Sequence, residues 1–313
     1  MRRIWVLAAV LACACSGSSA PPVEHPAAAQ IVASFDAASP VGLAAADGKV
    51  WVVEAAGSKI TGRSTPTSKP VTIRVGATPL RVVPDERRRL LWVSVFGADQ
   101  VVAVDPRTAE VVRRVHVAGQ PEGLVSAFGR VWVVRQQAQR LTEITTSGVG
   151  RSFRLGEEPR LVAASDSALF ASNFGAGTVT RVDPQSKKTA TSEKLCTGPQ
   201  DMVAIGDVLW VACTPDNKVV AVDAQTLRRL GKVSIDGEPD ALFYDGSSLY
   251  VVTTAGPTIV ELNHDPQHPA ALHRKALGEA APLFDQANVD ALRVAGKWWV
   301  SSPSENKVLV YPR

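Results

Sequence analysis

A four-residue phrase recurs seven times along the chain, and its spacing restricts the possible folds more than any other feature. "VWVV" begins at Val50 and returns unchanged at Val131, with looser copies such as "LWVA" and "LYVV" between and beyond. The steps between successive aromatic residues are 41, 40, 38, 40, 40 and 49 residues. These residues are Trp51, Trp92, Trp132, Phe170, Trp210, Tyr250 and Trp299. A fixed period near 40 residues is typical of repeat architectures.

A second marker, a proline, accompanies the phrase. It lies eleven residues before the aromatic residue in all but one of the six repeats that contain it, and Val289 takes its place in the seventh. The prolines are Pro40, Pro79, Pro121, Pro159, Pro199 and Pro239. The whole repeat unit, and not only the phrase, is therefore copied.

Each repeat reads as four short β-strands. Between Pro199 and Ile235 the strand-like segments "DMVAI", "VLWVA", "KVVAVD" and "LGKVSI" are separated by turn residues. Four strands leave no room for a helix, and no segment sustains a 3.6-residue period, so βαβ and helical repeats are excluded. A four-stranded sheet cannot bury both of its faces alone, whereas radial repetition packs each sheet on the next. The sequence predicts an all-β, seven-bladed β-propeller, with the repeated aromatic residues filling the wedges between blades.

The two ends of the body predict how the ring closes. The last repeat stops after its third strand, "KVLVYPR", while an unassigned strand, "QIVASFD" (Gln30 to Asp36), precedes the first proline. Pairing of the two would complete the seventh blade and remove an exposed sheet edge. We therefore expect residues 30–313 to form one seven-bladed domain.

The N-terminal residues follow the layout of an export signal. "MRRIWVLAAVLACAC" has two arginines and then nine apolar residues, too few to cross a hydrocarbon core of roughly 30 Å. "VLAC" resembles a bacterial lipobox, which implies a signal peptide at residues 1–12 and lipidation of Cys13. Residues 13–29 contain "SGSSAPPVEHPAAA", whose composition is typical of a flexible tether. We expect an exported protein, lipid-anchored on the extracytoplasmic side of the cell membrane, with plain secretion as the alternative.

Charge and cysteine content limit the partners and the redox chemistry. The formal net charge of the 313-residue chain is only +4, so the chain lacks the basic face of a nucleic-acid binder. We also expect the protein to be a monomer. Cys196 and Cys213 are the only cysteines of the body. In an exported protein such a pair is more often a disulfide than a reactive site, but two buried thiols stay open as the alternative.

Polar residues recur at the positions expected to surround one mouth of the central channel. Loops entering each first strand and loops leaving each second strand meet at that end, where ligand sites are expected. The predicted ring consists of Glu54, Arg81, Glu122, Arg135, Arg160, Asn173, Asp201, Asp240 and Asp290, with Gln200, Thr253 and Ser302 beside them. Two interpretations stay open: solvated loop ends that pair with one another, or a site for a polar or zwitterionic ligand or a peptide. We expect no cofactor, and no motif fixes a metal-ligand set.

Two further segments have weaker signals. The excess of the 49-residue step falls in "GEAAPLFDQAN" (Gly278 to Asn288), which is either a lid with Leu283 and Phe284 at its tip or a neutral insertion. "HDPQHPAALH" contains His264, His268 and His273, but its spacing and prolines are those of a polar turn rather than a metal site.

At this point the repeats resemble a known group. "LFASNFGAGTVTRVDPQSKK" (from Leu169), "LWVACTPDNKVVAVDAQTLR" (from Leu209) and "VVAVDPRTAEVV" (from Val101) are similar to the YVTN-type β-propeller repeat of extracytoplasmic bacterial proteins. The resemblance covers about residues 30–313. It implies the fold, because the motif residues build blades and turns, and it implies no catalytic residue.

Virginiamycin B lyase is an enzymatic family with similar repeats. That resemblance would imply two histidines and a glutamate around Mg²⁺ at the channel mouth. Here the histidines are His25 in the tether, His116 in an outer strand, and the three of the polar turn region, so no catalytic residue is transferred. We expect a lipid-anchored, non-catalytic propeller that binds a small polar ligand or a protein through its channel-mouth face. The alternative is a lyase or hydrolase acting there on a small cyclic or ester substrate.

Overall fold

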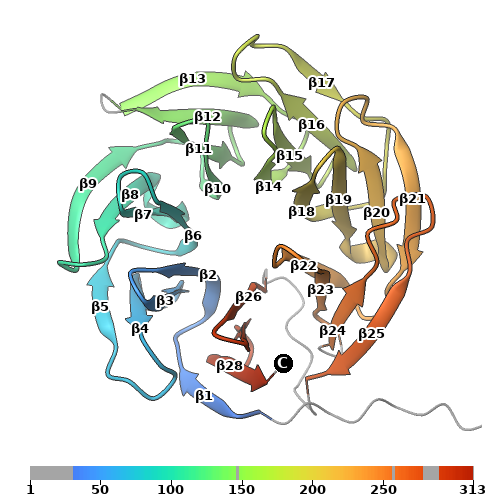
Figure 1. The fold of residues 1–313 in the computed structure, drawn as a ribbon. Helices are drawn as coiled ribbons and strands as arrows, with labels where there is room; N and C mark the ends of the chain where they lie inside the picture. Colours follow the sequence, from blue (N-terminus) through green and yellow to red (C-terminus); the bar gives the residue numbers. More distant parts are fainter. Residues whose placement is uncertain (1–30, 146–147, 256–257, 278–288, 313) are drawn as a thin grey trace, which may run out of the picture.

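Seven four-stranded antiparallel sheets surround a central opening in the computed structural model (Figure 1), which describes residues 31–145, 148–255, 258–277 and 289–312. From the centre outward, blades 1 to 4 are β2 (Pro40–Ala46), β3 (Lys49–Glu54), β4 (Lys59–Arg63), β5 (Val71–Arg74); β6 (Pro79–Asp85), β7 (Leu90–Val95), β8 (Gln100–Asp105), β9 (Glu110–His116); β10 (Pro121–Ala127), β11 (Arg130–Arg135), β12 (Arg140–Thr145), β13 (Gly148–Arg154); and β14 (Pro159–Ala164), β15 (Leu169–Asn173), β16 (Thr178–Val182), β17 (Thr189–Thr191). Blades 5 to 7 are β18 (Pro199–Ile205), β19 (Val208–Cys213), β20 (Lys218–Asp223), β21 (Arg229–Ser234); β22 (Pro239–Tyr244), β23 (Leu249–Thr253), β24 (Thr258–Leu262), β25 (Ala271–Ala276); and β26 (Ala291–Val294), β27 (Lys297–Ser302), β28 (Lys307–Pro312), β1 (Ala33–Asp36). The predicted seven-bladed propeller is confirmed.

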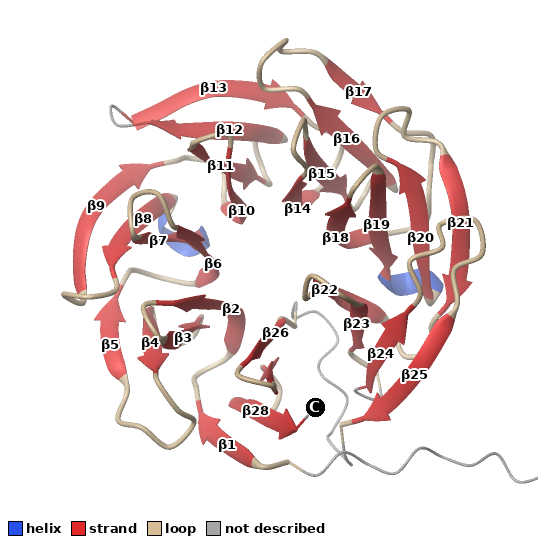
Figure 2. Ribbon diagram, viewed as in Figure 1, coloured by secondary structure: helices blue, strands red, loops and turns tan. Residues whose placement is uncertain are grey.

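Helical structure in the described ranges is limited to two single turns, η1 (Phe96–Ala98) and η2 (Thr214–Asp216), which follow the second strands of blades 2 and 5 (Figure 2). No helix in those ranges has the length and apolar character needed to span a bilayer.

The ring closes as the sequence predicts. β1 pairs with β28 in antiparallel register, from Ala33 opposite Val310 to Asp36 opposite Lys307. Phe35 of β1 is 9% exposed and packs edge-on against Trp299, with ring centroids 5.8 Å apart. The N-terminal strand thus supplies the fourth strand of blade 7 and covers the edge of β28.

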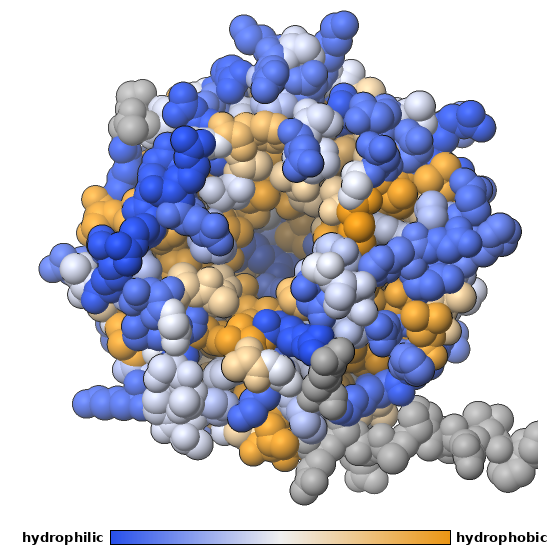
Figure 3. Space-filling model, viewed as in Figure 1, coloured by the Kyte–Doolittle hydropathy of each residue, from blue (hydrophilic) through white to orange (hydrophobic). Residues whose placement is uncertain are grey.

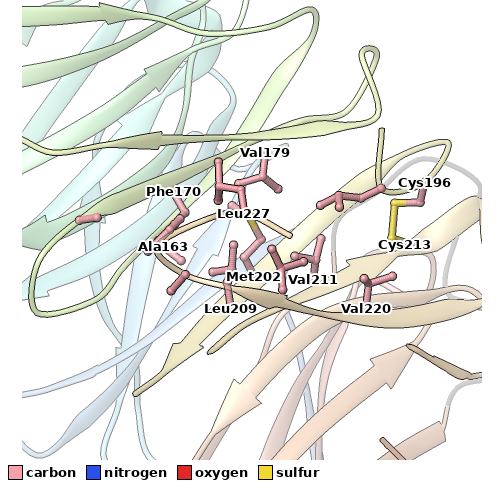
Figure 4. Close-up of a cluster of buried hydrophobic side chains, with 14 residues drawn as sticks. Ala163, Phe170, Val179, Cys196, Met202, Leu209, Val211, Cys213, Val220 and Leu227 are labelled. Atoms are coloured by element: carbon pink, nitrogen blue, oxygen red, sulfur yellow. A yellow bond between two sulfur atoms is a disulfide. The ribbon is translucent and has the colours of Figure 1, made fainter. Parts of the chain in front are cut away.

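Each interface between neighbouring blades contains one cluster of buried apolar side chains. The repeated aromatic residue of the second strand belongs to that cluster in every blade, and its exposure ranges from 0% at Trp51 to 8% at Tyr250. Figure 4 shows the cluster between blades 4 and 5, where Phe170 packs with Met202 and Leu209. The aromatic residues are wedge-filling core, as their spacing predicts.

The first strands share a break in register directly after the proline. Pro40 lies opposite Glu54, but the next pair is Leu43 with Val52, so a bulge separates them. The same irregularity follows the proline of each of the other five repeats that have one. One or two residues after the proline thereby leave the regular ladder.

The strand register of blade 7 corrects the position that the sequence analysis assigned to Val289. Ala291 pairs with Val300, the residue after Trp299, and the equivalent partner in the other blades is the third residue after the proline. Val289 is therefore not the counterpart of the proline but of the residue that follows it. Asp290 consequently occupies the second position, the position of Arg81 and Asp201.

Candidate functional site

The predicted ring of nine polar residues divides into two groups with different surroundings. Five of its members, Arg81, Arg160, Asp201, Asp240 and Asp290, come from the first strands or the residue before them and form one electrostatic group at the channel. Three others, Glu54, Arg135 and Asn173, end the second strands and bind the loops that enter their own blades. The ninth, Glu122, is 3% exposed in β10.

The three channel aspartates join consecutive first strands. One carboxylate oxygen of Asp201 accepts the backbone N–H of Leu242 in blade 6 at 2.8 Å. Asp240 accepts the N–H of Val289 at 2.7 Å, and Asp290 accepts the N–H of Leu43 in blade 1 at 2.8 Å. The contacts therefore run from blade 5 to 6, from 6 to 7 and across the ring closure from 7 to 1.

In blades 1 and 3 a glycine takes the position of Asp201 and Asp290, the second after the proline, and the backbone of the next blade lies close to it. A Cβ on Gly123 would lie 2.6 Å from the carbonyl oxygen of Arg160 in the next blade, and one on Gly42 would lie 2.8 Å from that of Leu80. Second-position residues thus set the spacing of the blades around the channel, by a carboxylate contact in some blades and by direct backbone contact in others.

Burial keeps protons on the three aspartates at unusually high pH, and repulsion by a neighbouring aspartate adds to this effect at Asp201 and Asp240. Desolvation raises the pKa of Asp201 to about 6 and that of Asp240 to about 7, and it raises the pKa of Asp290 as well. The positive charge of Arg81 acts in the opposite direction on all three, and its Nη1 lies 3.7 Å from the Asp290 carboxylate. Near neutral pH the charge of this cluster therefore responds to small changes in its surroundings.

Two arginines of the channel group retain unused donors. Arg81 is only 9% exposed, and its Nε–H has no acceptor within the described part of the chain. The Nε–H of Arg160 also lacks one there, while its guanidinium lies over the Phe174 ring at 4.0 Å. A buried guanidinium with an unsatisfied N–H is able to bind a carboxylate, and its planar fork suits two parallel hydrogen bonds.

A cavity of about 440 Å³ adjoins the cluster and has two kinds of lining. Arg81, Asp201 and Asp290 provide its polar part, and aliphatic side chains such as Leu43, Leu161 and Leu292 provide the remainder. The lining continues along the first strands to Ala45, Pro84 and Val294, next to the hairpins that join first and second strands. Figure 3 shows the hollowed centre of one face, with hydrophilic surface at its depth. The charged group lies at the predicted end of the first strands, but its cavity extends toward the opposite end.

The second group has a structural role that the sequence did not reveal. Each of its residues lies opposite the proline and contacts the loop entering the same blade: Glu54 accepts the N–H of Ala38, Arg135 donates to the carbonyl of Ala118, and Asn173 accepts the N–H of Gly156. Glu54 and Asn173 are 3% and 0% exposed. Glu54 and Asn173 are thus buried, and all three residues hydrogen-bond a loop of their own blade.

Blade 5 makes the same contact covalently. Cys213 lies opposite Pro199, and its sulfur is bonded to that of Cys196, three residues before the proline, at 2.13 Å. Gly156 precedes Pro159 by the same three residues in blade 4, where Asn173 makes the contact. The disulfide (Figure 4) thus joins the end of the second strand to the loop that enters the blade, and other blades make the same connection by hydrogen bonds.

The histidines of the described ranges lie away from the channel. His116 ends outer strand β9, His273 is in outer strand β25, and His264 and His268 lie in the turn between β24 and β25. His268 is paired with Asp265 at 3.2 Å in that exposed turn. Within those ranges no three His, Cys, Asp or Glu side chains form a group suited to a metal ion. The predicted lid residues Leu283 and Phe284, and the predicted lipidation site Cys13, lie outside the described residues.

One ion pair at the channel was missed at the sequence level. Arg293 of β26 lines the cavity and donates to Asp245, at the end of the neighbouring β22. Both side chains are largely buried. Desolvation acts to raise the pKa of Asp245, but hydrogen bonds from Ser247, Ser248 and then Arg293 outweigh it and lower that pKa to about 2. The two residues are 48 positions apart and belong to no repeated motif, so only the ring geometry brings them together.

Comparison with known proteins supports the fold. No family model matches the chain, and no curated protein matches it. Among solved structures, a streptogramin B lyase is similar with a TM-score of 0.75 and 14% identity, covering 89% of this chain and 95% of the lyase. Virginiamycin B lyase from Staphylococcus aureus has a TM-score of 0.73 and 14% identity, covering 90% and 98%. The RRP9 WD40 repeats reach 0.76 at 9% identity, covering 92% and 99%. These likenesses show the fold alone.

Proposed function

We propose that this protein is an exported, non-catalytic binding propeller that holds a small zwitterionic ligand in its central channel. The observation that carries the proposal is the partly satisfied Arg81, 91% buried among three aspartates at a cavity of about 440 Å³. A ligand carboxylate would accept from Arg81, and a ligand ammonium would lie near Asp201 and Asp240. The aliphatic remainder of the lining suits a small apolar body between the two charges.

The enzyme alternative rests on the likeness to streptogramin-opening lyases. Their names alone do not transfer an activity at 14% identity. The histidines implied by that family resemblance have no counterparts at this channel in the described ranges, where the lining charges are arginine and aspartate. One feature favours chemistry: the pKa of Asp240, at about 7, is that of a possible general acid.

The first experiment is a thermal-shift screen of amino acids, dipeptides, betaines, sugars and streptogramin-type lactones. A ligand that binds only the folded protein raises the melting temperature. We expect a zwitterion to do so, and Arg81→Gln to abolish the shift. Arg135→Gln is the matched control, because Arg135 belongs to the second group and binds the carbonyl of Ala118. A shift that survives Arg81→Gln, or none with any zwitterion, would reject the proposed site.

Proton exchange separates binding from catalysis. An ammonium placed beside Asp240 and Asp201 lowers their pKa values, so binding at pH 6.5 should release protons, which calorimetry in buffers of different ionisation enthalpy measures. Turnover of a lactone that is lost in Asp240→Asn would support the enzyme alternative instead.

The location is part of the same proposal. The export layout of residues 1–12 and the "VLAC" phrase support lipidation of Cys13 and anchoring at the extracytoplasmic side of the membrane. Labelling with a fatty-acid analogue in a bacterial host should mark the protein and should fail for Cys13→Ala, with Cys15→Ala as the matched control. Retained labelling in Cys13→Ala would contradict the assignment of the lipid.

A further inference from the structure

A second cavity, of about 200 Å³, lies between blades 2 and 3, away from the channel. The second, third and fourth strands of blade 2 and the second and third strands of blade 3 line it. Its apolar wall includes Leu90, Trp92 and Ile144, and its cationic side chains are Arg88, Arg113 and Arg130. None of these residues belongs to the channel group, so this cavity is independent of the function proposed above.

Trp92 differs from Trp51 and Trp132 in its hydrogen bonding. The indole N–H of Trp51 donates to the carbonyl of Ala46, and that of Trp132 donates to the carbonyl of Ala127, each at 3.3 Å. The indole N–H of Trp92 has no acceptor in the described ranges, although the residue is only 6% exposed. A buried donor without an acceptor is costly, so it indicates a missing partner.

The hairpin before Trp92 is longer than those before Trp51 and Trp132. In blades 1 and 3 two residues separate the first and second strands, and the acceptor carbonyl belongs to the last residue of the first strand. Four residues separate β6 from β7, so the residue five positions before Trp92 is Arg87, inside the hairpin loop. The position that supplies the acceptor carbonyl for Trp51 and Trp132 therefore lies outside the strand in blade 2.

The same hairpin adds positive charge. It reads "ERRR" from Glu86 to Arg89. The guanidinium of Arg88 bonds Asp85 at 2.7 Å and reaches the carbonyl of Gly129 in blade 3 at 3.2 Å. Figure 3 shows a band of hydrophilic surface over the region of β6–β9, with apolar surface beside it.

Arg130 of blade 3 adds a second guanidinium to the lining and pairs with Glu143 at 2.9 Å. A guanidinium has five N–H groups, so Arg88 and Arg130 keep donors beyond those these contacts use.

We infer that this cavity binds a carboxylate that carries one apolar side chain, about the size of leucine or phenylalanine. The indole N–H and the arginine donors would receive the carboxylate, and the wall of Leu90, Ile144 and the Trp92 ring would receive the hydrocarbon. The ligand is either a free acylated amino acid or the C-terminus of a peptide, since both present the same chemistry.

Isothermal titration of the purified protein with N-acetyl-leucine and with N-acetyl-leucine amide tests the inference. Only the carboxylate should bind. Trp92→Phe keeps the aromatic ring but removes the donor and should weaken binding about tenfold or more. Trp132→Phe is the matched control, because its N–H is already bonded to Ala127, and it should leave the affinity unchanged. A peptide ending in leucine that binds more tightly than N-acetyl-leucine would identify a chain terminus as the source, and equal affinity would identify the free compound.

Stability provides a second readout that does not depend on the choice of probe. Both substitutions remove the same part of a buried ring, but Trp132→Phe also removes a made hydrogen bond whereas Trp92→Phe removes an unsatisfied donor, so Trp132→Phe should lower the melting temperature more than Trp92→Phe. Equal binding of carboxylate and amide, equal competition by inorganic phosphate, or an affinity unaffected by Trp92→Phe would overturn the inference. So would the absence of carboxylate binding at millimolar concentration.

Discussion

Replacement of the blade 5 disulfide by two alanines should destabilise the protein by about 3 kcal/mol. Cys196 and Cys213 are 17 residues apart, and closing a loop of that length in the unfolded chain costs about 3 kcal/mol of conformational entropy at 25 °C. The entropy of unfolding scales with chain length, so for a domain of this size the loss corresponds to a fall in melting temperature of roughly 5 °C. The variants are best made with Cys13 and Cys15 replaced by serine, which leaves only these two thiols.

The repeat provides its own control. Cys196→Gly with Cys213→Asn copies the hydrogen-bonded pair of Gly156 and Asn173 in blade 4, and it should recover part of the stability lost in Cys196→Ala with Cys213→Ala. Urea unfolding measures both differences. If a reductant leaves the melting temperature of the parent protein within about 1 °C, or if both thiols react freely without reduction, the reasoning fails.

Three further predictions concern the ring and its channel. Phe35→Ala should lower the free energy of unfolding in urea by about 3–5 kcal/mol, because it removes the buried ring that packs β1 against Trp299. Val32→Ala, at a residue that is 51% exposed, should change it little. Equal effects of the two substitutions would contradict the closure of the ring by β1. Gly123→Ala should cost about 1–3 kcal/mol, because the new Cβ would lie 2.6 Å from the backbone of the next blade. Gly57→Ala is the control, because a Cβ there lies closest, at 3.0 Å, to the flexible Lys59 side chain. A tolerated Gly123→Ala would refute the close approach of the two blades. The pKa of Asp240 is raised from 3.8 to about 7, so ionisation of its carboxyl group destabilises the fold progressively as the pH rises through that window. The free energy of unfolding of Asp240→Asn, relative to that of the parent protein, should therefore increase between pH 4 and pH 8. A difference that does not change with pH would show that the pKa is not raised.

The sequence by itself determined the architecture. The 40-residue period, the wedge aromatics and the unassigned strand around Phe35 specify seven blades and their closure, because alternating apolar patterns and turn residues act within single repeats. The cysteine pair was recognisable as a candidate disulfide for the same reason, since both residues belong to one repeat. Positions near the channel were also found, because the proline marks the same place in each blade.

Only the tertiary structure decided what those positions do. Arg81 and Asp290 are 209 residues apart in the chain, and their contact at 3.7 Å exists because the ring brings blades 2 and 7 to the same channel. Glu54 and Asn173 are residue types that would suit a ligand-binding ring, yet each of them hydrogen-bonds a loop of its own blade. The sequence cannot separate these cases, because burial and pKa depend on which neighbours a side chain meets after the blades assemble. The physical reason is that the repeated pattern specifies contacts within one blade and between adjacent blades, whereas the channel brings together residues from blades that are far apart in the sequence.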